Sequence, residues 1–246
     1  MASNVKNSNI VVGLDIGTSK VVCIVGKYNE HEKLEIISLG AYPSSGLKKG
    51  VVVNIDATTD AIKKAVEQAQ SMIEEKIKSV YVGIAGSHIK SLNSQGAVGI
   101  KDKEVTPYDI DRVIDSAQAV SIPSDQNVLH VLPQEYVIDN QEVSLDPLGM
   151  AGVRLEAKVH LVTCANSAVK NIEKCIKNCG LSVDGFVLEQ LASSHSILSE
   201  DEKDLGVCLV DIGGGTTDIA IFNSGSIVFT GVIPIAGDQV TSDIAQ

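Results

Sequence analysis

Two short glycine-containing segments carry the residues of this chain that could do chemistry. The first, Asp15–Lys20, reads Asp-Ile-Gly-Thr-Ser-Lys, and the second, Asp211–Asp218, reads Asp-Ile-Gly-Gly-Gly-Thr-Thr-Asp. Each lies between two apolar runs, which predicts a strand, a tight turn and a second strand. Glycine in such a turn permits positive φ and a close approach to a ligand, and successive N–H groups form an anion site. The leading aspartate can hold Mg²⁺, usually through water. The pair therefore predicts a clamp that binds a polyphosphate and its metal from opposite sides.

The two segments differ in specificity. From average residue usage, the pattern Asp-x-Gly-Thr arises by chance in about one chain of this length in twenty. The longer pattern, Asp-x-Gly-Gly-Gly-Thr-x-Asp, arises in about one in 10⁵. The alternative for either segment is a β-hairpin whose glycines only form the turn. Their occurrence together, in the same strand context, favours the clamp.

Length and composition limit the fold and the partners. A chain of 246 residues can bury a core and could form two domains. Hydrophobic residues make up 44%, with 3% aromatic and no tryptophan, so the core must be aliphatic, which is typical of an α/β protein. A net charge of −11 argues against nucleic-acid binding and against a polybasic membrane patch.

The cysteine pattern predicts neither a zinc site nor a disulfide framework. Cys175 and Cys179 lie one helical turn apart, on the same apolar stripe as Ile172, so core packing is the better interpretation. His160 and Cys164 share one face of a predicted strand and are likewise interpreted as interior residues. No segment resembles a signal peptide or a membrane span, which predicts a cytoplasmic protein.

The first part of the chain predicts an α/β unit of the ribonuclease-H type. Three consecutive strands are expected within residues 10–42, followed by a helix capped by Asp56 whose apolar spacing continues to Ile77. The segment Ser79–Ile84 then predicts a parallel return strand.

The pattern changes between residues 87 and 162. We expect strands at His88–Asn93 and Gln95–Ile100, a helix that Thr106 caps with Pro107 in its first turn, and two longer strands. The longer strands are Val128–Ile138 and Val153–Thr163. This arrangement predicts a small inserted α+β subdomain.

The second glycine segment opens a repeat of the first unit. A helix at Asn166–Cys179, a strand at Ser182–Leu188 and a helix near Glu189 precede it, and strands at Asp218–Phe222 and Ser226–Pro234 follow. The same strand, turn and strand order in both halves indicates an internal duplication. The predicted lobes are 1–86 with 163–198, the insert 87–162, and 199–246. The last lobe lacks the helices that would cover its sheet, so we expect the parent protein to continue.

Both glycine segments resemble the phosphate motifs of the actin, sugar-kinase and heat-shock-chaperone ATPase superfamily. Within it, Leu191–Thr216 is similar, nearly residue for residue, to the FtsA family of bacterial cell-division proteins, as are Val232–Gly237 and Val240–Ala245. The resemblance covers essentially the whole chain. It implies duplicated actin-like lobes with an SHS2-type subdomain inserted at 87–162.

The resemblance also implies a function and its residues. It implies an ATP-binding scaffold that anchors the FtsZ ring at the cytoplasmic membrane, forms filaments and recruits later division proteins through 87–162. Asp15 and Asp211 would orient hydrated Mg²⁺. The phosphates would be held on one side by Gly17, Thr18, Ser19 and Lys20, and on the other by Gly213, Gly214, Gly215, Thr216 and Thr217.

A catalytic residue is less clearly indicated. Hydrolytic members of the superfamily position the attacking water with an acid or amide between the lobes, where this chain has Glu189 and Gln190. The FtsA family keeps no fixed acid there, and a glutamate at a helix N-terminus is also explained by the helix dipole. We therefore expect weak or no ATPase activity, with Glu189 as the candidate.

The resemblance places the adenosine-binding segment, the membrane helix and most of the FtsZ-binding lobe beyond Gln246. We therefore expect this chain alone to bind nucleotide weakly. A sugar or acetate kinase on the same fold is the alternative function, but the insert offers no convincing catalytic base. A chaperone-type ATPase would have Glu-Pro between the lobes, whereas Gln190 follows Glu189 here.

Overall fold

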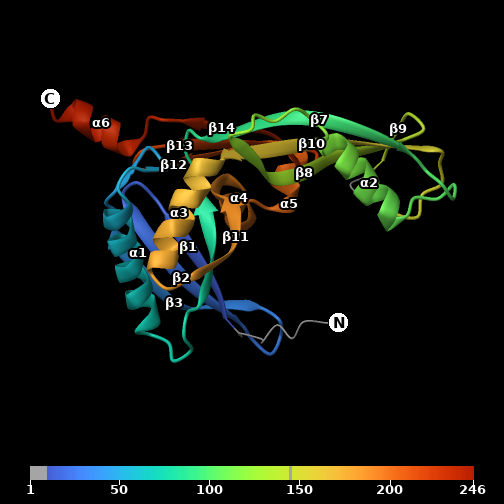
Figure 1. Ribbon diagram of the computed structural model, residues 1–246. Coiled ribbons are helices and arrows are strands. Elements are labelled where there is room, and N and C mark those ends of the chain that lie inside the picture. The colour runs from blue at the N-terminus through green and yellow to red at the C-terminus, as the bar shows by residue number, and fades with distance from the viewer. Residues whose placement is uncertain (1–9, 144–145) are drawn as a thin grey trace.

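The computed structural model describes residues 10–143 and 146–246 (Figure 1). Four sheets are formed, with strand orders β11-β6-β1-β2-β3, β7-β10-β8-β9, β12-β13-β14 and β4-β5. The strands are β1 (Ile10–Ile16), β2 (Lys20–Tyr28), β3 (Leu34–Pro43), β4 (Leu47–Lys48), β5 (Val51–Val52), β6 (Ser79–Ile84), β7 (Ile89–Gly99), β8 (Gln126–Ile138), β9 (Gln141–Val143), β10 (Arg154–Ala165), β11 (Ser182–Leu188), β12 (Val207–Ile212), β13 (Thr217–Asn223) and β14 (Ser226–Ile233). The helices are α1 (Ile55–Gln70), α2 (Pro107–Gln118), α3 (Asn166–Asn178), α4 (Glu189–Ile197), α5 (Glu200–Leu205) and α6 (Gly237–Ile244).

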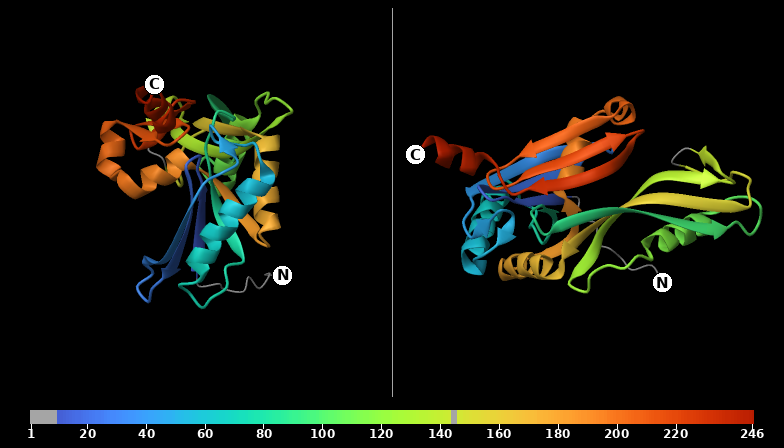
Figure 2. Two further views of the ribbon diagram at one scale, coloured as in Figure 1. Left: turned by 90° about the vertical axis from the view of Figure 1, so that its left-hand side faces the viewer. Right: turned by 90° about the horizontal axis from the view of Figure 1, so that it is seen from above.

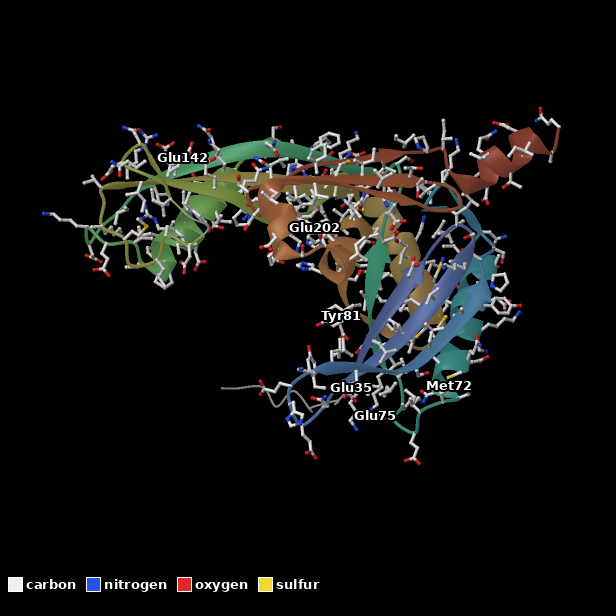
Figure 3. All side chains as sticks on the ribbon, turned by 180° about the vertical axis from the view of Figure 1, so that it is seen from behind. Glu35, Met72, Glu75, Tyr81, Glu142 and Glu202 are labelled. Carbon is white, nitrogen blue, oxygen red and sulfur yellow. The ribbon has the colours of Figure 1, made fainter. Side chains whose placement is uncertain are left out.

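The five-stranded sheet is built from three antiparallel strands and two parallel returns. β1 pairs antiparallel with β2 and parallel with β6, as the sequence predicted, and β6 pairs parallel with β11. Alternate residues of β1 are buried beneath α1 and α3, which lie side by side on one face (Figure 1). Tyr81 of β6 lies on the opposite face and is 46% exposed (Figure 3). That opposite face lines the cavity described below.

Helix α1 begins and ends differently from the prediction. Asn54, not Asp56, is its N-cap, because the Asn54 side chain accepts a hydrogen bond from the N–H of Ala57 at 3.0 Å. The helix ends at Gln70 although apolar residues continue at helical spacing. The Gln70 side chain accepts a hydrogen bond from the Ile77 N–H at 2.8 Å, so this backbone donor in the segment after the helix has a partner.

Gly40 of β3 lies directly beneath α1. A Cβ at this position would collide with the carbonyl oxygen of Ala65 and lie 2.6 Å from the nitrogen of Ala69. Because helix backbone cannot move as a flexible side chain does, we expect Gly40→Ala to lower the free energy of unfolding by about 2 kcal/mol or more. Gly99→Ala is the matched control, since a Cβ there meets nothing within 4 Å. Urea unfolding would contradict this packing if both variants were equally stable.

The inserted sheet is antiparallel and carries α2 on one face. The prediction that Thr106 caps α2 is confirmed: its hydroxyl accepts from the Asp109 N–H, and the Asp109 carboxylate accepts in return from the Thr106 N–H, which completes a capping box. The prediction of two strands at 88–100 is wrong, since β7 is continuous. It pairs along its whole length with β10, so the polar residues near Ser94 do not interrupt it.

The strands β12, β13 and β14 form a small sheet that lies beside the inserted sheet (Figure 2). Its buried face packs through Leu209, Ala220 and Phe222 against Leu132 of β8. Helix α5 was not predicted; Ser199 and Glu202 form a capping box at its start.

None of the helices within 10–143 and 146–246 is both long and apolar enough to cross a bilayer.

Candidate functional site

The two glycine turns have the same backbone geometry. Gly17 donates its N–H to the carbonyl of Lys20 at 3.0 Å, and Gly213 donates to that of Thr216 at 2.9 Å. In each hairpin the aspartate stands two positions before this glycine, where it pairs with the partner strand. The duplication inferred from the sequence is therefore present in the strand register as well.

The turns contact each other at the junction of the two hairpins. A Cβ at Gly215 would lie 2.7 Å from the Thr18 hydroxyl, and one at Gly214 would lie 3.0 Å from the Ser19 Cβ. The turn glycines are absent from the residues with positive φ. The expectation that glycine serves positive φ here is wrong; it is required for close approach.

Four backbone donors at this junction point to an anion. Within the part of the chain that the structure describes, the N–H groups of Thr18, Ser19, Gly214 and Gly215 have no hydrogen-bond acceptor. Unpaired backbone donors of successive turn residues are the usual ligands of phosphate groups in proteins. The donor set therefore fits the phosphates that the sequence motifs predict.

Asp15 and Asp211 line one cavity of about 450 Å³, although they belong to different hairpins. Lys20 and Glu189 line the same cavity, Lys20 from the first turn and Glu189 from the start of α4. The other lining residues are Gly13, Leu14, Val22, Ile24, Tyr81, Val82, Gly83, Val187, Ala192 and Ser193. The five-stranded sheet thus supplies most of the apolar residues together with Asp15 and Lys20, while α4 and β12 supply Glu189 and Asp211.

Burial and neighbouring carboxylates raise the pKa of Asp15 and of Glu189 in this cavity. Burial raises the pKa of Asp15, which Lys20 lowers and Asp211 raises further. Burial also raises the pKa of Glu189 well above its ordinary value, and Asp15, Asp218 and Asp211 add to the rise. These carboxylates repel one another in the absence of a cation, so a bound cation would stabilise their charged forms.

Burial also raises the pKa of Asp218 to about 6, with Thr216 lowering it by hydrogen bonding and Asp211 raising it.

A divalent metal fits this donor set through water. The described residues contain no group of three His, Cys, Asp or Glu side chains arranged as direct ligands. Carboxylates that surround a space without converging on one point suit Mg²⁺, which retains several of its waters.

The remaining predicted residues lie in different surroundings. Thr216 is buried, and Thr217 donates its hydroxyl to the Ile235 carbonyl at 2.8 Å, so that it lines neither cavity of this region. Glu189 faces the cavity, whereas Gln190 is fully buried and donates to Asp218 at 3.0 Å. Of the two candidates on α4, only Glu189 is therefore placed to contact a ligand.

The sequence analysis did not identify two cavity residues that contact the predicted carboxylates. Ser193 donates its hydroxyl to the Asp211 carboxylate at 3.2 Å, which orients that carboxylate. Its position four residues after Glu189, on the same face of α4, was the available signal. Gly83 lies beneath Glu189, where a Cβ would be 3.1 Å from the Glu189 Cγ.

The cysteine and histidine residues that the sequence analysis interpreted as interior packing lie as follows in the structure. Cys175 is buried and its thiol faces the Ile55 carbonyl of α1, while the Cys179 thiol faces the Thr59 carbonyl. His160 and Cys164 are buried in the interior, as predicted. Cys175 and Cys179 thus pack between α3 and α1, whereas His160 and Cys164 lie within β10.

Two family models match the chain. One, described as the SHS2 domain inserted in FTSA, matches residues 86–163; the other, described as cell division protein FtsA, matches residues 208–246. The chain is 63% identical over 244 residues to cell division protein FtsA of Pseudomonas aeruginosa, covering 99% of this chain and 58% of that protein. It is 48% identical over 236 residues to that of Escherichia coli K12, covering 96% and 56%. The chain thus spans little more than half the length of these relatives.

Solved structures agree on the fold. A chain of the PilM–PilN type IV pilus biogenesis complex superimposes with a TM-score of 0.71 at 16% identity, covering 96% of this chain and 64% of that one. The ethanolamine utilization protein EutJ from Carboxydothermus hydrogenoformans gives 0.55 at 15% identity, covering 98% and 58%. The predicted fold, actin-like α/β lobes with an SHS2 insert, is therefore confirmed. The chain belongs to the FtsA family of cell division proteins.

Proposed function

We propose that this protein binds MgATP between its two glycine turns and acts as an actin-like scaffold in cell division. The observation that carries the proposal is that Asp15 and Asp211, far apart in the sequence, line one cavity. Each stands three residues before a turn whose N–H groups lack an acceptor within the described part of the chain. In this proposal Lys20 and the turn donors hold the phosphates, and the two aspartates orient hydrated Mg²⁺. The metal would neutralise phosphate charge that the carboxylates would otherwise repel.

The site residues Gly17, Thr18, Ser19, Lys20 and the segment Gly213–Thr216 belong to this proposal, with the first lobe, insert and second lobe divided as the sequence predicted. Adenine would be held by parts of the protein beyond this chain. Binding is the main function, and hydrolysis is secondary. In this proposal Glu189 would orient an attacking water, which is supported by its lining the same cavity as both aspartates.

The scaffold proposal extends to the partners of the whole protein. We propose that it lies on the cytoplasmic face of the membrane, binds FtsZ, self-associates into filaments, and recruits later division proteins through residues 87–162. The family membership supports this cell-division role. It does not favour the alternative of a sugar or acetate kinase.

The full-length protein tests this proposal directly. With MgATP we expect it to sediment with lipid vesicles and to bring FtsZ into the pellet, while releasing little phosphate. Omission of MgATP is the control and should reduce the sedimented fraction. Rapid phosphorylation of a small sugar or of acetate by the same preparation would instead support the kinase.

A further inference from the structure

A second cavity lies on the other side of the two turns. Its volume is about 270 Å³, and Thr18, Gly214 and Gly215 line it together with Lys48 and Lys49. Its other lining residues are Leu47, Pro234, Ile235, Ala236, Asp238 and Gln239. The two lysines therefore stand beside three of the four residues whose N–H groups lack an acceptor in the described chain.

The lysines come from a hairpin whose turn is poorly suited to lysine. β4 and β5 pair Leu47 with Val52 and Lys48 with Val51, which leaves Lys49–Gly50 as a two-residue loop. Both loop residues have positive φ, 51° at Lys49 and 74° at Gly50. Such a turn strongly favours Asn-Gly, and a lysine in the left-handed region is strained. The turn itself gives no reason for a lysine at position 49, and strain of this kind is often kept at functional sites.

The hairpin tip is held against the first glycine turn. Gly50 donates its N–H to the Thr18 hydroxyl at 3.3 Å, and Thr18 is the residue that faces Gly215 across the junction. A Cβ at Gly50 would lie 2.7 Å from the Cα of Gly86. The hairpin tip thus lies between Thr18 and Gly86. These contacts position the backbone of Lys49 relative to the first glycine turn.

Carboxylates lie on both sides of the two turns, with Asp238 lining the second cavity beside Lys48 and Lys49. In the first cavity Asp15, Glu189 and Asp211 outnumber Lys20, and the whole chain has a net charge of −11. Neither Lys48 nor Lys49 forms an ion pair within the described residues. Their charges are therefore available to an anion at the turns, where like charges from the carboxylates would otherwise oppose its binding.

We propose that Lys48 and Lys49 form a second cationic contact to the phosphates at the turns, opposite Lys20. This inference rests on the proposed nucleotide function and adds residues that the glycine motifs do not contain. The β4–β5 hairpin is then a third element of the clamp. Because Gly50 is bonded to Thr18, the position of the lysines follows that of the first turn.

Replacing Lys49 with asparagine removes the charge without destabilising the turn, so an effect on binding can be told apart from an effect on folding. Asparagine is favoured in this turn, so Lys49→Asn in the full-length protein should keep or raise the melting temperature, by about 2 °C. Its affinity for MgATP, measured by calorimetry, should nevertheless fall about tenfold, and Lys49→Arg should remain within about twofold of the unchanged protein. Lys33→Asn is the matched control, since Lys33 is an exposed lysine in the β2–β3 connection, at the end of β2 remote from Lys20.

Different results would contradict the lysine contact and the proposed nucleotide binding. MgATP affinity of Lys49→Asn within twofold of the unchanged protein, together with loss of binding in Asp211→Ala, would overturn the lysine contact alone. Weak binding by Lys49→Arg as well as Lys49→Asn would show a structural role and overturn it too. If the unchanged full-length protein bound no nucleotide, the proposed function would fail, and this inference with it.

Discussion

Asp211→Ala in the full-length protein should abolish MgATP binding, lowering the affinity by at least about 100-fold. Asp211 lines the cavity opposite Asp15, and Ser193 fixes its carboxylate through a hydrogen bond of 3.2 Å. In the proposed function the Asp211 carboxylate orients hydrated Mg²⁺, so its loss would weaken the binding of the metal that links the protein to the phosphates. Calorimetric titration with MgATP measures the effect, and Asp211→Asn tests the charge without changing the volume.

The surroundings of Asp211 make the opposite outcome informative. Asp211 raises the pKa of Asp15, Glu189 and Asp218, so removing it also removes electrostatic repulsion from the cavity. If no metal were involved, an anion would bind the variant as well as or better than the unchanged protein. Such a result would show that the clamp assignment is wrong. Asp111→Ala, at an exposed aspartate of α2, is the control for net charge.

Acidification should destabilise the contact between the inserted sheet and the sheet of β12, β13 and β14 through His160. This side chain is 2% exposed. Its Nδ1 lies 2.6 Å from the Asn93 Oδ1 of β7, and its Nε2 lies 2.9 Å from the Thr230 hydroxyl of β14. Ser91 donates to the Thr230 carbonyl beside it. One buried ring thus joins three strands of two sheets.

Burial lowers the pKa of His160 to about 4. Between an ordinary value near 6.5 and this value, the unfolded chain binds a proton that the folded chain does not, so folding loses stability as the pH falls. The loss attributable to His160 should approach about 3 kcal/mol at pH 4 and vanish above neutrality. Urea unfolding across this range measures it.

His160→Gln provides the comparison, because glutamine offers a donor and an acceptor but does not titrate. Burial also lowers the pKa of His88 and of His130, and these residues contribute equally to both proteins. The difference in unfolding free energy between the two proteins should therefore change with pH between about 6.5 and 4. A constant difference over this range would mean that His160 is not buried as a neutral ring.

The sequence by itself determined the local elements of this protein and the repetition of one of them. Apolar runs bounded by Asp-x-Gly turns predicted both hairpins, and Thr106 with Pro107 predicted the start of α2. These signals lie within a few residues, because turns and caps are satisfied by their own neighbours. Where two local signals competed, as with Asn54 and Asp56 before α1, the sequence did not identify the cap.

Only the tertiary structure decided which residues meet at the site. Asp15 and Asp211 share a cavity because two hairpins distant in the sequence approach each other, and the glycines at 214 and 215 permit that approach by lacking a Cβ. Ser193 and the Lys48–Lys49 hairpin reach the turns from other elements and carry no motif. Contacts between distant segments depend on how the sheets pack, and packing is set by the whole folded chain and not by neighbouring residues.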